Sequence, residues 1–194
     1  MIRTKLNRPM AGPQTILRNR VMESLDQGMK RRLILMVAGA GYGKSTAASA
    51  WMDQKQKMGT RVVWLSLDVD DNDPHRFMRY LTTALAANLK GLEAVMDSLH
   101  SGDLAHLEWV LDECVFAIEQ GTEEQILILA LDDYHLIQDQ AIDEALDYLI
   151  RHSPETFKIL MITRKRPNLP LALYRSRGWL HELDEALLAF DDNE

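Results

Sequence analysis

A glycine-rich stretch between an apolar run and a helix-forming segment carries the residues best suited to chemistry. Residues 33–46 read L-I-L-M-V-A-G-A-G-Y-G-K-S-T. Glycines let the backbone approach a phosphate closely, and the N–H groups that open the following helix favour an anion. The stretch therefore predicts a phosphate-binding loop at a strand-to-helix joint. The residues predicted to contact a nucleotide here are Ala38, Gly39, Ala40, Gly41, Tyr42, Gly43, Lys44, Ser45 and Thr46.

Two side chains of this loop have specific roles in such a site. Lys44 supplies a mobile ammonium group for the β- and γ-phosphates, and the Ser45 hydroxyl is placed to ligate Mg²⁺. The pattern G-x-x-x-x-G-K-[ST] begins with glycine, whereas this chain has Ala38 at that place. The alternative is a glycine-rich turn that binds no phosphate, but the flanking strand and helix favour the loop.

A pair of aspartates follows the apolar segment 126–131. This segment is apolar on both faces, as a central parallel strand should be, and parallel strands deliver their carboxyl ends to one edge of the sheet. We therefore expect Asp132 and Asp133 to arrive beside the phosphate loop. Asp132 is predicted to hold Mg²⁺ through its water shell, and Asp133 to activate the attacking water. An acidic turn without a ligand is the alternative.

Arginines near the carboxyl-terminal end form a third group of candidates. Arg164 follows the predicted strand 157–163 and would contact the γ-phosphate, although a solvated arginine at a strand end is an almost equal alternative. Arg175 and Arg177 are further candidates for that role, and the sequence does not separate them. No other His or Cys lies at metal-ligand spacing from His135, which argues against a zinc site.

The acidic run D-V-D-D-N-D-P at 68–74 invites a calcium-loop interpretation. An EF-hand loop needs glycine at its sixth place and glutamate at its twelfth, but these places hold Asp73 and Arg79. We instead expect Asp73-Pro74 to cap and begin a helix.

The order of the elements predicts an α/β fold of the P-loop NTPase type, with a mostly parallel five-stranded sheet and helices on both faces. Strands are predicted at 33–37, 62–67, 126–131, 157–163 and 179–183. Helices are predicted at 17–26, at 44–57, from Pro74 onward, at 104–120 and at 140–151. Residues 89–103 are expected to be irregular, and a proline-rich segment follows Arg164.

Composition sets the broad class of the protein. The chain has 194 residues, 46% of them apolar, which suits one α/β domain. We expect an extended basic arm at 1–13, the ATPase domain at 14–187 and the start of a linker at 188–194. A net charge of −7 makes direct binding to a DNA duplex improbable for this segment. There is no secretory signal and no apolar run long enough to span a bilayer, so a cytoplasmic protein is expected.

Several stretches together resemble the N-terminal ATPase domain of the MalT-type, LuxR-family transcriptional regulators, which belong to the STAND class of P-loop NTPases. They occur in the order of that family and cover nearly the full length. They read T-K-L-N-R-P (4–9), A-G-A-G-Y-G-K-S (38–45), W-L-S-L-D (64–68), D-N-D-P-x-R-F (71–77), L-D-D-Y-H-L-I (131–137), I-R-H-S-P-E (150–155) and T-R (163–164). Ala38 fits this resemblance, because the family often lacks the first glycine of the loop.

The resemblance implies an ATP-dependent activator. In such regulators an inducer and ATP together favour self-association, and a C-terminal helix-turn-helix then binds DNA. A winged-helix segment and a helical-repeat sensor lie between these parts. The 194 residues would be an N-terminal fragment or a truncated gene product without the sensor and DNA-binding modules. The resemblance also implies that the segment from Ile16 to Arg20 lines the adenine pocket.

The sequence thus predicts an ATP-binding switch domain that uses ATP and Mg²⁺ and hydrolyses slowly. One alternative is a small-molecule or nucleoside kinase with the same loop, in which Arg164, Arg166, Arg175 and Arg177 would form a lid. Another is an interaction module that binds nucleotide only to hold its shape.

Overall fold

Five strands, all parallel, form the central sheet of the computed structural model, which describes residues 3–9, 18–101 and 107–189. The strands lie in the spatial order β2-β3-β4-β1-β5. Their bounds are β1 (Leu33–Val37), β2 (Arg61–Ser66), β3 (Leu127–Asp132), β4 (Phe157–Thr163) and β5 (Leu180–Leu183). All five predicted strands are therefore present, to within one residue at either end.

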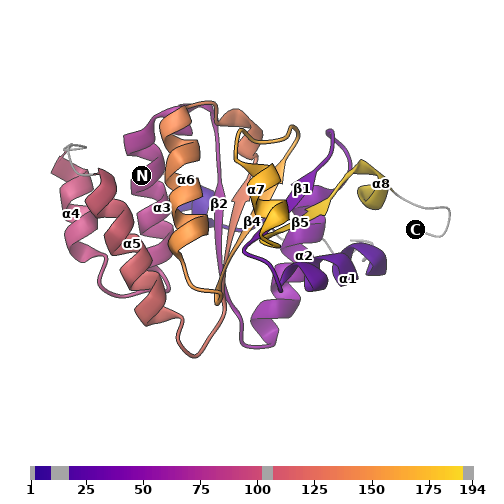
Figure 1. Ribbon diagram of the computed structural model, residues 1–194, viewed down its shortest axis with the longest axis horizontal. Helices are drawn as coiled ribbons and strands as arrows, with labels where there is room; N and C mark the ends of the chain where they lie inside the picture. Colours follow the sequence, from indigo (N-terminus) through magenta and orange to yellow (C-terminus); the bar gives the residue numbers. More distant parts are fainter. Residues whose placement is uncertain (1–2, 10–17, 102–106, 190–194) are drawn as a thin grey trace.

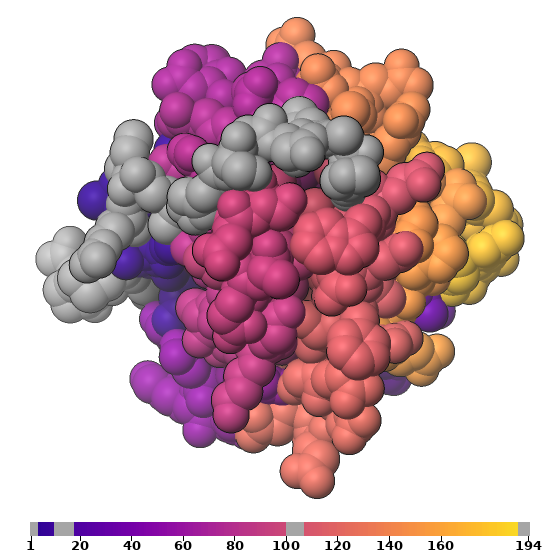
Figure 2. Space-filling view, turned by 90° about the vertical axis from the view of Figure 1, so that its left-hand side faces the viewer, coloured from indigo at the N-terminus to yellow at the C-terminus, as the bar shows by residue number. Residues whose placement is uncertain are grey.

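Helices cover both faces of this sheet, as Figure 1 shows. The α-helices are α1 (Asn19–Gly28), α2 (Lys44–Lys57), α3 (Pro74–Ala86), α4 (Glu93–Ser101), α5 (Leu107–Gly121), α6 (Gln140–His152), α7 (Leu171–Ser176) and α8 (Glu185–Leu188). The described residues also form the short 3₁₀ helices η1 (Arg3–Leu6), η2 (Val69–Asn72) and η3 (Tyr134–Leu136). Helices α4 and α5 form the outer surface of the face seen in Figure 2. None of the described helices is long and apolar enough to cross a membrane.

Two separate cores follow from the alternation of side chains along the strands. Leu33 and Leu35 of β1 face the larger core, together with apolar residues of α3, α4, α5, α6 and α7. Ile34 and Met36 face the other core, where α1, α2 and α8 pack. Because both faces are covered, strands β1, β3 and β4 are apolar almost throughout.

The structure corrects the prediction of an irregular segment at 89–103. Residues 93–101 form α4, and its buried Val95 and Leu99, with Leu92 just before it, have helical spacing. The stretch is short and Gly91 precedes it, so its helical pattern is weak in sequence and is completed by packing on α3. Similarly, α7 begins directly after Pro170 within the segment predicted only as proline-rich.

The first helix also differs from its prediction. It begins at Asn19 and extends to Gly28, two residues beyond the predicted end at 26. Gly28 is helical, and a Cβ atom there would lie 2.8 Å from the Ile34 side chain. The glycine thus permits close packing of α1 on β1, which no local sequence signal reveals.

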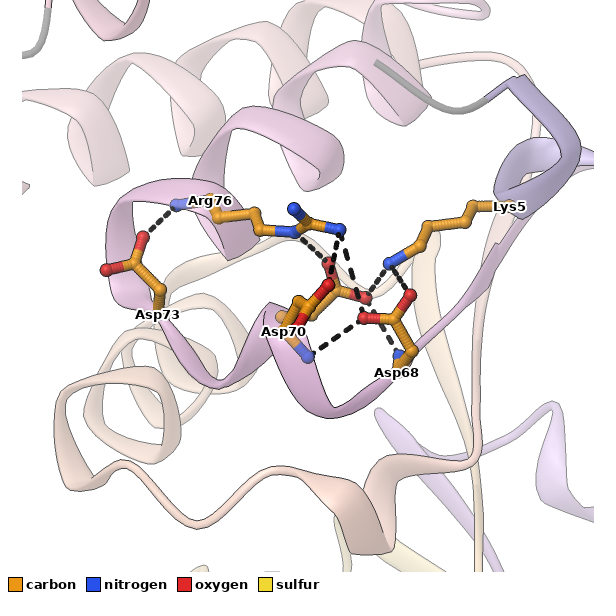
Figure 3. Close-up of polar contacts among 6 residues, drawn as sticks. Lys5, Asp68, Asp70, Asp73 and Arg76 are labelled. Carbon is orange, nitrogen blue, oxygen red and sulfur yellow. Dashed lines mark hydrogen bonds and ion pairs between the residues drawn. The ribbon is translucent and has the colours of Figure 1, made fainter.

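The described residues of the expected extended arm, 3–9, pack on the rest of the domain. Residues 3–6 form the 3₁₀ helix η1, and the Lys5 side chain is buried. Figure 3 shows it directed at the acidic run that contains Asp68. The Lys5 ammonium group lies 2.6 Å from Asp68 Oδ2, contacts Asp71 Oδ2 and sits 4.8 Å from the centre of the Tyr80 ring. Arg76 Nε donates to Asp71 Oδ1 from the other side, at 3.1 Å. The acidic run of 68–74 therefore holds two basic side chains.

Removing the charge of Lys5 should destabilise the fold. Asp71 is fully buried, and in a Lys5→Met variant its carboxylate would keep only Arg76 as a cationic partner. Breaking a buried ion pair from one side typically costs about 3–5 kcal/mol. We expect the free energy of unfolding, measured in urea, to fall by an amount near the lower end of this range. Lys57→Met, at an exposed helix end, is the control. Equal stability of the Lys5 variant and the parent would show that the cluster contributes little.

A second buried contact supports the end of β3. The Tyr134 hydroxyl donates to Asp143 Oδ1 of α6 at 2.6 Å, and both residues are buried. Burial raises the pKa of Asp143, although the bond from Tyr134 opposes this. The folded carboxyl therefore holds its proton more tightly than the unfolded one, so its protonation at lower pH stabilises the fold.

Tyr134→Phe should lower the free energy of unfolding by about 1–3 kcal/mol at pH 7, because a buried carboxylate loses its donor. The loss should shrink as the pH falls toward the raised pKa of Asp143, since the protonated carboxyl is neutral. Urea unfolding at several pH values measures both effects. Tyr148→Phe removes a hydroxyl bonded to exposed Asp112 and should change little. A loss that is independent of pH would refute the role given to Asp143.

Candidate functional site

The loop between β1 and α2 has the backbone conformation that its glycines permit. Gly41 and Gly43 have φ values of 86° and 65°, in the left-handed region that favours glycine. Helix α2 begins at Lys44, directly after Gly43. The first backbone N–H groups of α2 have no acceptor within the helix, so they can receive an anion.

Ala38 belongs to the core rather than to the exposed part of the loop. It is buried among residues of α1, α2 and the sheet. The methyl group thus fills space on the α2 side of β1, and this explains why the first place of the loop does not need glycine here.

The Lys44 side chain contacts the backbone of the loop. Its ammonium group donates to the carbonyl oxygens of Ala38 and Gly39, each at 2.7 Å. Burial lowers its pKa, and the positive charge of Arg164 adds to this effect. The carboxylates of Asp133 and Asp132 act in the opposite direction. Arg164 and both aspartates therefore lie within electrostatic reach of the loop lysine.

Ser45 and Asp132 are in direct contact. Ser45 Oγ donates to Asp132 Oδ1 at 2.8 Å, and the same oxygen accepts from the Asp133 backbone N–H at 3.0 Å. Asp132 is only 5% exposed, and this burial raises the pKa of its carboxyl. A hydroxyl oxygen and a carboxylate oxygen this close are suitable ligands for a hard cation such as Mg²⁺.

The strand order changes how these residues meet. We expected Asp132 beside the end of the loop strand, but β4 lies between β1 and β3. The first turn of α2 spans this gap, so that Ser45 reaches Asp132 past the end of β4. Arg164 directly follows β4, the strand that lies between the loop strand β1 and the aspartate strand β3.

Asp133 occupies a strained backbone position at this edge. Its φ of 59° is the only positive value among the described residues other than glycine. The side chain is half exposed, and its Oδ1 lies 3.7 Å from His135 Nδ1. Asp133 thus turns away from the buried strand that ends at Asp132 and is accessible to water. Backbone strain of this kind often accompanies functional residues.

Two of the arginine candidates are engaged elsewhere. Arg175 Nε donates to Glu182 Oε2 at 2.7 Å. Arg177 lies over the Trp179 ring, 4.7 Å from its centre. Trp179 precedes β5, and its backbone carbonyl accepts hydrogen bonds from the backbone N–H groups of Arg32 and Leu33 at the start of β1. Arg177 is therefore at the amino-end edge of the sheet, opposite the phosphate loop.

The residues expected at the adenine pocket are only partly placed. Ile16 lies outside the described residues. Arg20 donates to the backbone carbonyls of Ala189 and Ala186, at 2.8 and 3.4 Å, so its guanidinium is directed to α8 and the residue after it. Two further residues contact the loop: Arg18, within the segment expected at the adenine pocket, and Glu185, which no sequence motif indicates. Neither has a spacing signal, because their contacts join segments far apart in sequence.

Known proteins are similar to this chain in sequence and in fold. The chain is 35% identical over 194 residues to the HTH-type transcriptional regulator MalT of Vibrio cholerae, with all of this chain and 21% of that protein aligned. It is 35% identical over 198 residues to MalT of Yersinia enterocolitica, with the same coverage. The chain thus spans about a fifth of the length of these relatives. No family model matches the chain.

Solved structures share the fold at low sequence identity. A STAND protein with a tetratricopeptide repeat sensor from Pyrococcus horikoshii aligns with a TM-score of 0.54 at 16% identity, over 93% of this chain and 24% of that one. A Walker-type ATPase of Pyrococcus abyssi gives 0.53 at 14%, over 93% and 58%. The Orc1 protein of Aeropyrum pernix, solved with DNA, gives 0.59 at 17%, over 89% and 46%.

Proposed function

Because this chain is homologous to the N-terminal region of the MalT transcriptional regulators and has the fold of a P-loop ATPase, we propose that it is an ATP-binding switch domain that hydrolyses ATP slowly. The observation that carries the proposal is the contact between Ser45 and Asp132 beside Lys44. It unites the phosphate loop with a strand-end carboxylate 87 positions away, and a merely structural turn would not require this.

Each residue of the site has a role that follows from its chemistry. The N–H groups at the start of α2 and the Lys44 ammonium bind the phosphates. Ser45 and Asp132 would hold Mg²⁺, which neutralises phosphate charge when bound. Asp133, the more exposed carboxylate, orients the attacking water and accepts its proton. Arg164, which directly follows the intervening strand β4, would contact the γ-phosphate.

The switch follows from differential contacts. The γ-phosphate adds interactions with Lys44 and Arg164 that a diphosphate lacks, so ATP and ADP favour different arrangements of the strand-end loops. A difference of about 1.4 kcal/mol already changes the ratio of two states tenfold. Self-association and DNA binding would then be properties of a longer regulator, with DNA contacted outside this acidic segment. The MalT relatives are named as HTH-type regulators.

The kinase alternative finds no support in the arginines. Arg166 and Arg175 both pair with Glu182, and Arg177 stacks on Trp179. Only Arg164 of the four lies at the end of a strand beside the loop. The remaining alternative, a module that binds nucleotide without turnover, is separated from our proposal by the second experiment below.

Lys44→Ala should weaken ATP binding about tenfold to a hundredfold, the equivalent of one charge-assisted hydrogen bond of about 1.5–3 kcal/mol. Isothermal titration calorimetry with MgATP measures the change. Lys57→Ala, at the far end of the same helix, should bind like the parent. If Lys44→Ala binds ATP as tightly as the parent, the loop is not a phosphate site.

Asp133→Asn should keep ATP binding and lose turnover by about a hundredfold or more, as expected on removal of a general base. Asparagine tolerates the left-handed backbone of this position nearly as well as aspartate, so the fold should persist. Phosphate release measures the rate, with Glu144→Gln on the exposed side of α6 as the control. Unchanged turnover would remove Asp133 from the mechanism. Turnover in the parent equal to that of Lys44→Ala would favour the non-catalytic module.

A further inference from the structure

The short helix α8 is in direct contact with the phosphate loop. Glu185, its first residue, accepts a hydrogen bond from the Gly39 backbone N–H at 3.0 Å through Oε1. The two residues are 146 positions apart in sequence. A carboxylate of α8 thus lies on an N–H group of the loop that is predicted to contact nucleotide.

Arg18 joins the other end of the loop to the same helix. Its Nη2 donates to the Tyr42 carbonyl at 3.0 Å, and its Nη1 donates to the Leu188 carbonyl at 2.5 Å. The side chain is almost fully buried. A Cβ atom on Gly43 would lie 3.3 Å from Arg18 Nη2, which shows how closely the guanidinium approaches the loop. The loop therefore contacts α8 directly at Gly39 and through Arg18 at Tyr42.

Helix α8 depends on such contacts for its position. It has only four residues, too few to be stable by its own hydrogen bonds. Leu188 is buried in the same core as α1 and α2, and Arg20 donates to carbonyls of Ala186 and Ala189. Asp184 caps the helix through the Leu187 N–H. A shift of the loop would therefore be transmitted to α8.

Electrostatics gives the direction of this coupling. The Glu185 carboxylate acts on Lys44 as a nearby negative charge. The phosphates of a nucleotide would bring further negative charge to the same loop and the same lysine. Two anions held by one small set of donors repel each other. Glu185 at the loop and a bound triphosphate thus disfavour one another.

We propose that Glu185 and Arg18 are positioning residues that couple the phosphate loop to α8, so that binding of nucleotide phosphates displaces Glu185 from the loop and loosens α8. This rests on the proposed nucleotide site. Since coupling between two sites is reciprocal, removing the Glu185 contact should tighten nucleotide binding by the same factor by which nucleotide weakens that contact.

The test compares Glu185→Ala with Glu23→Ala, which removes the same side chain from an exposed position of α1. Titration calorimetry with Mg²⁺ and a slowly hydrolysed ATP analogue measures affinity, and we expect Glu185→Ala to bind about fivefold tighter. Hydrogen exchange of the amides of Leu188 and Ala189, which donate to the carbonyls of Asp184 and Glu185, reports on the helix. In the parent and in Glu23→Ala the analogue should speed this exchange, whereas in Glu185→Ala exchange should be fast throughout.

Glu185→Gln separates charge from contact. Its amide oxygen can still accept from Gly39, so α8 should exchange slowly without nucleotide, while the affinity gained by removal of the charge should remain. A purely structural role of Glu185 would not raise affinity in either variant. Arg18→Lys keeps the charge but reaches fewer carbonyls, and it should speed exchange of α8 without nucleotide.

Two results would overturn the inference in distinguishable ways. If the parent binds the analogue but its α8 exchange does not respond and Glu185→Ala has unchanged affinity, the coupling is absent while the nucleotide site stands. If the parent binds no nucleotide, the proposed function fails and the inference fails with it.

Discussion

The hydrogen bond from Ser45 to Asp132 joins the first turn of α2 to the end of β3, past the intervening strand β4. The arrangement requires that α2 pack closely on the sheet at its start, and the buried Ala38, Ala47 and Ala48 make that approach possible. Small side chains here let the loop, the helix and two strand ends meet at one edge. The rest of the architecture serves to keep this edge rigid, because the parallel sheet is buried on both faces.

Long-range polar contacts then fix the segments that surround the edge. Lys5 is buried against Asp71 of η2, Tyr134 holds α6 to the turn after β3, and Arg18 holds the loop to α8. Each places a polar group in the interior, where it stabilises only if its partner stays in place. Such contacts resist gradual deformation, so a change at the loop favours a discrete rearrangement. This property suits a domain whose proposed purpose is to adopt different states with ATP and ADP.

Charges of both signs surround Lys44. Arg164 lowers the pKa of Lys44, whereas the carboxylates of Asp133, Asp132 and Glu185 raise it. The buried Asp132 carboxyl has a raised pKa, which is the expected result of placing an anion in a poorly solvated position without a full positive partner. A divalent cation shared with Ser45 would supply that partner, and this agrees with the chemistry proposed for the pair.

The sequence by itself determined the glycine-rich loop between β1 and α2, the pair of aspartates at the end of β3 and all five strands, because these depend on local composition and on alternation of strands with helices. Tertiary structure alone decided the strand order, which placed β4, the strand that precedes Arg164, between β1 and β3. It also decided the burial of Lys5, the direction of Arg20 toward α8 and the contacts of Arg18 and Glu185 with the loop. A lone charged residue has no periodicity, and its partner can lie more than a hundred positions away. Only the packing of the whole chain determines which of these residues meet.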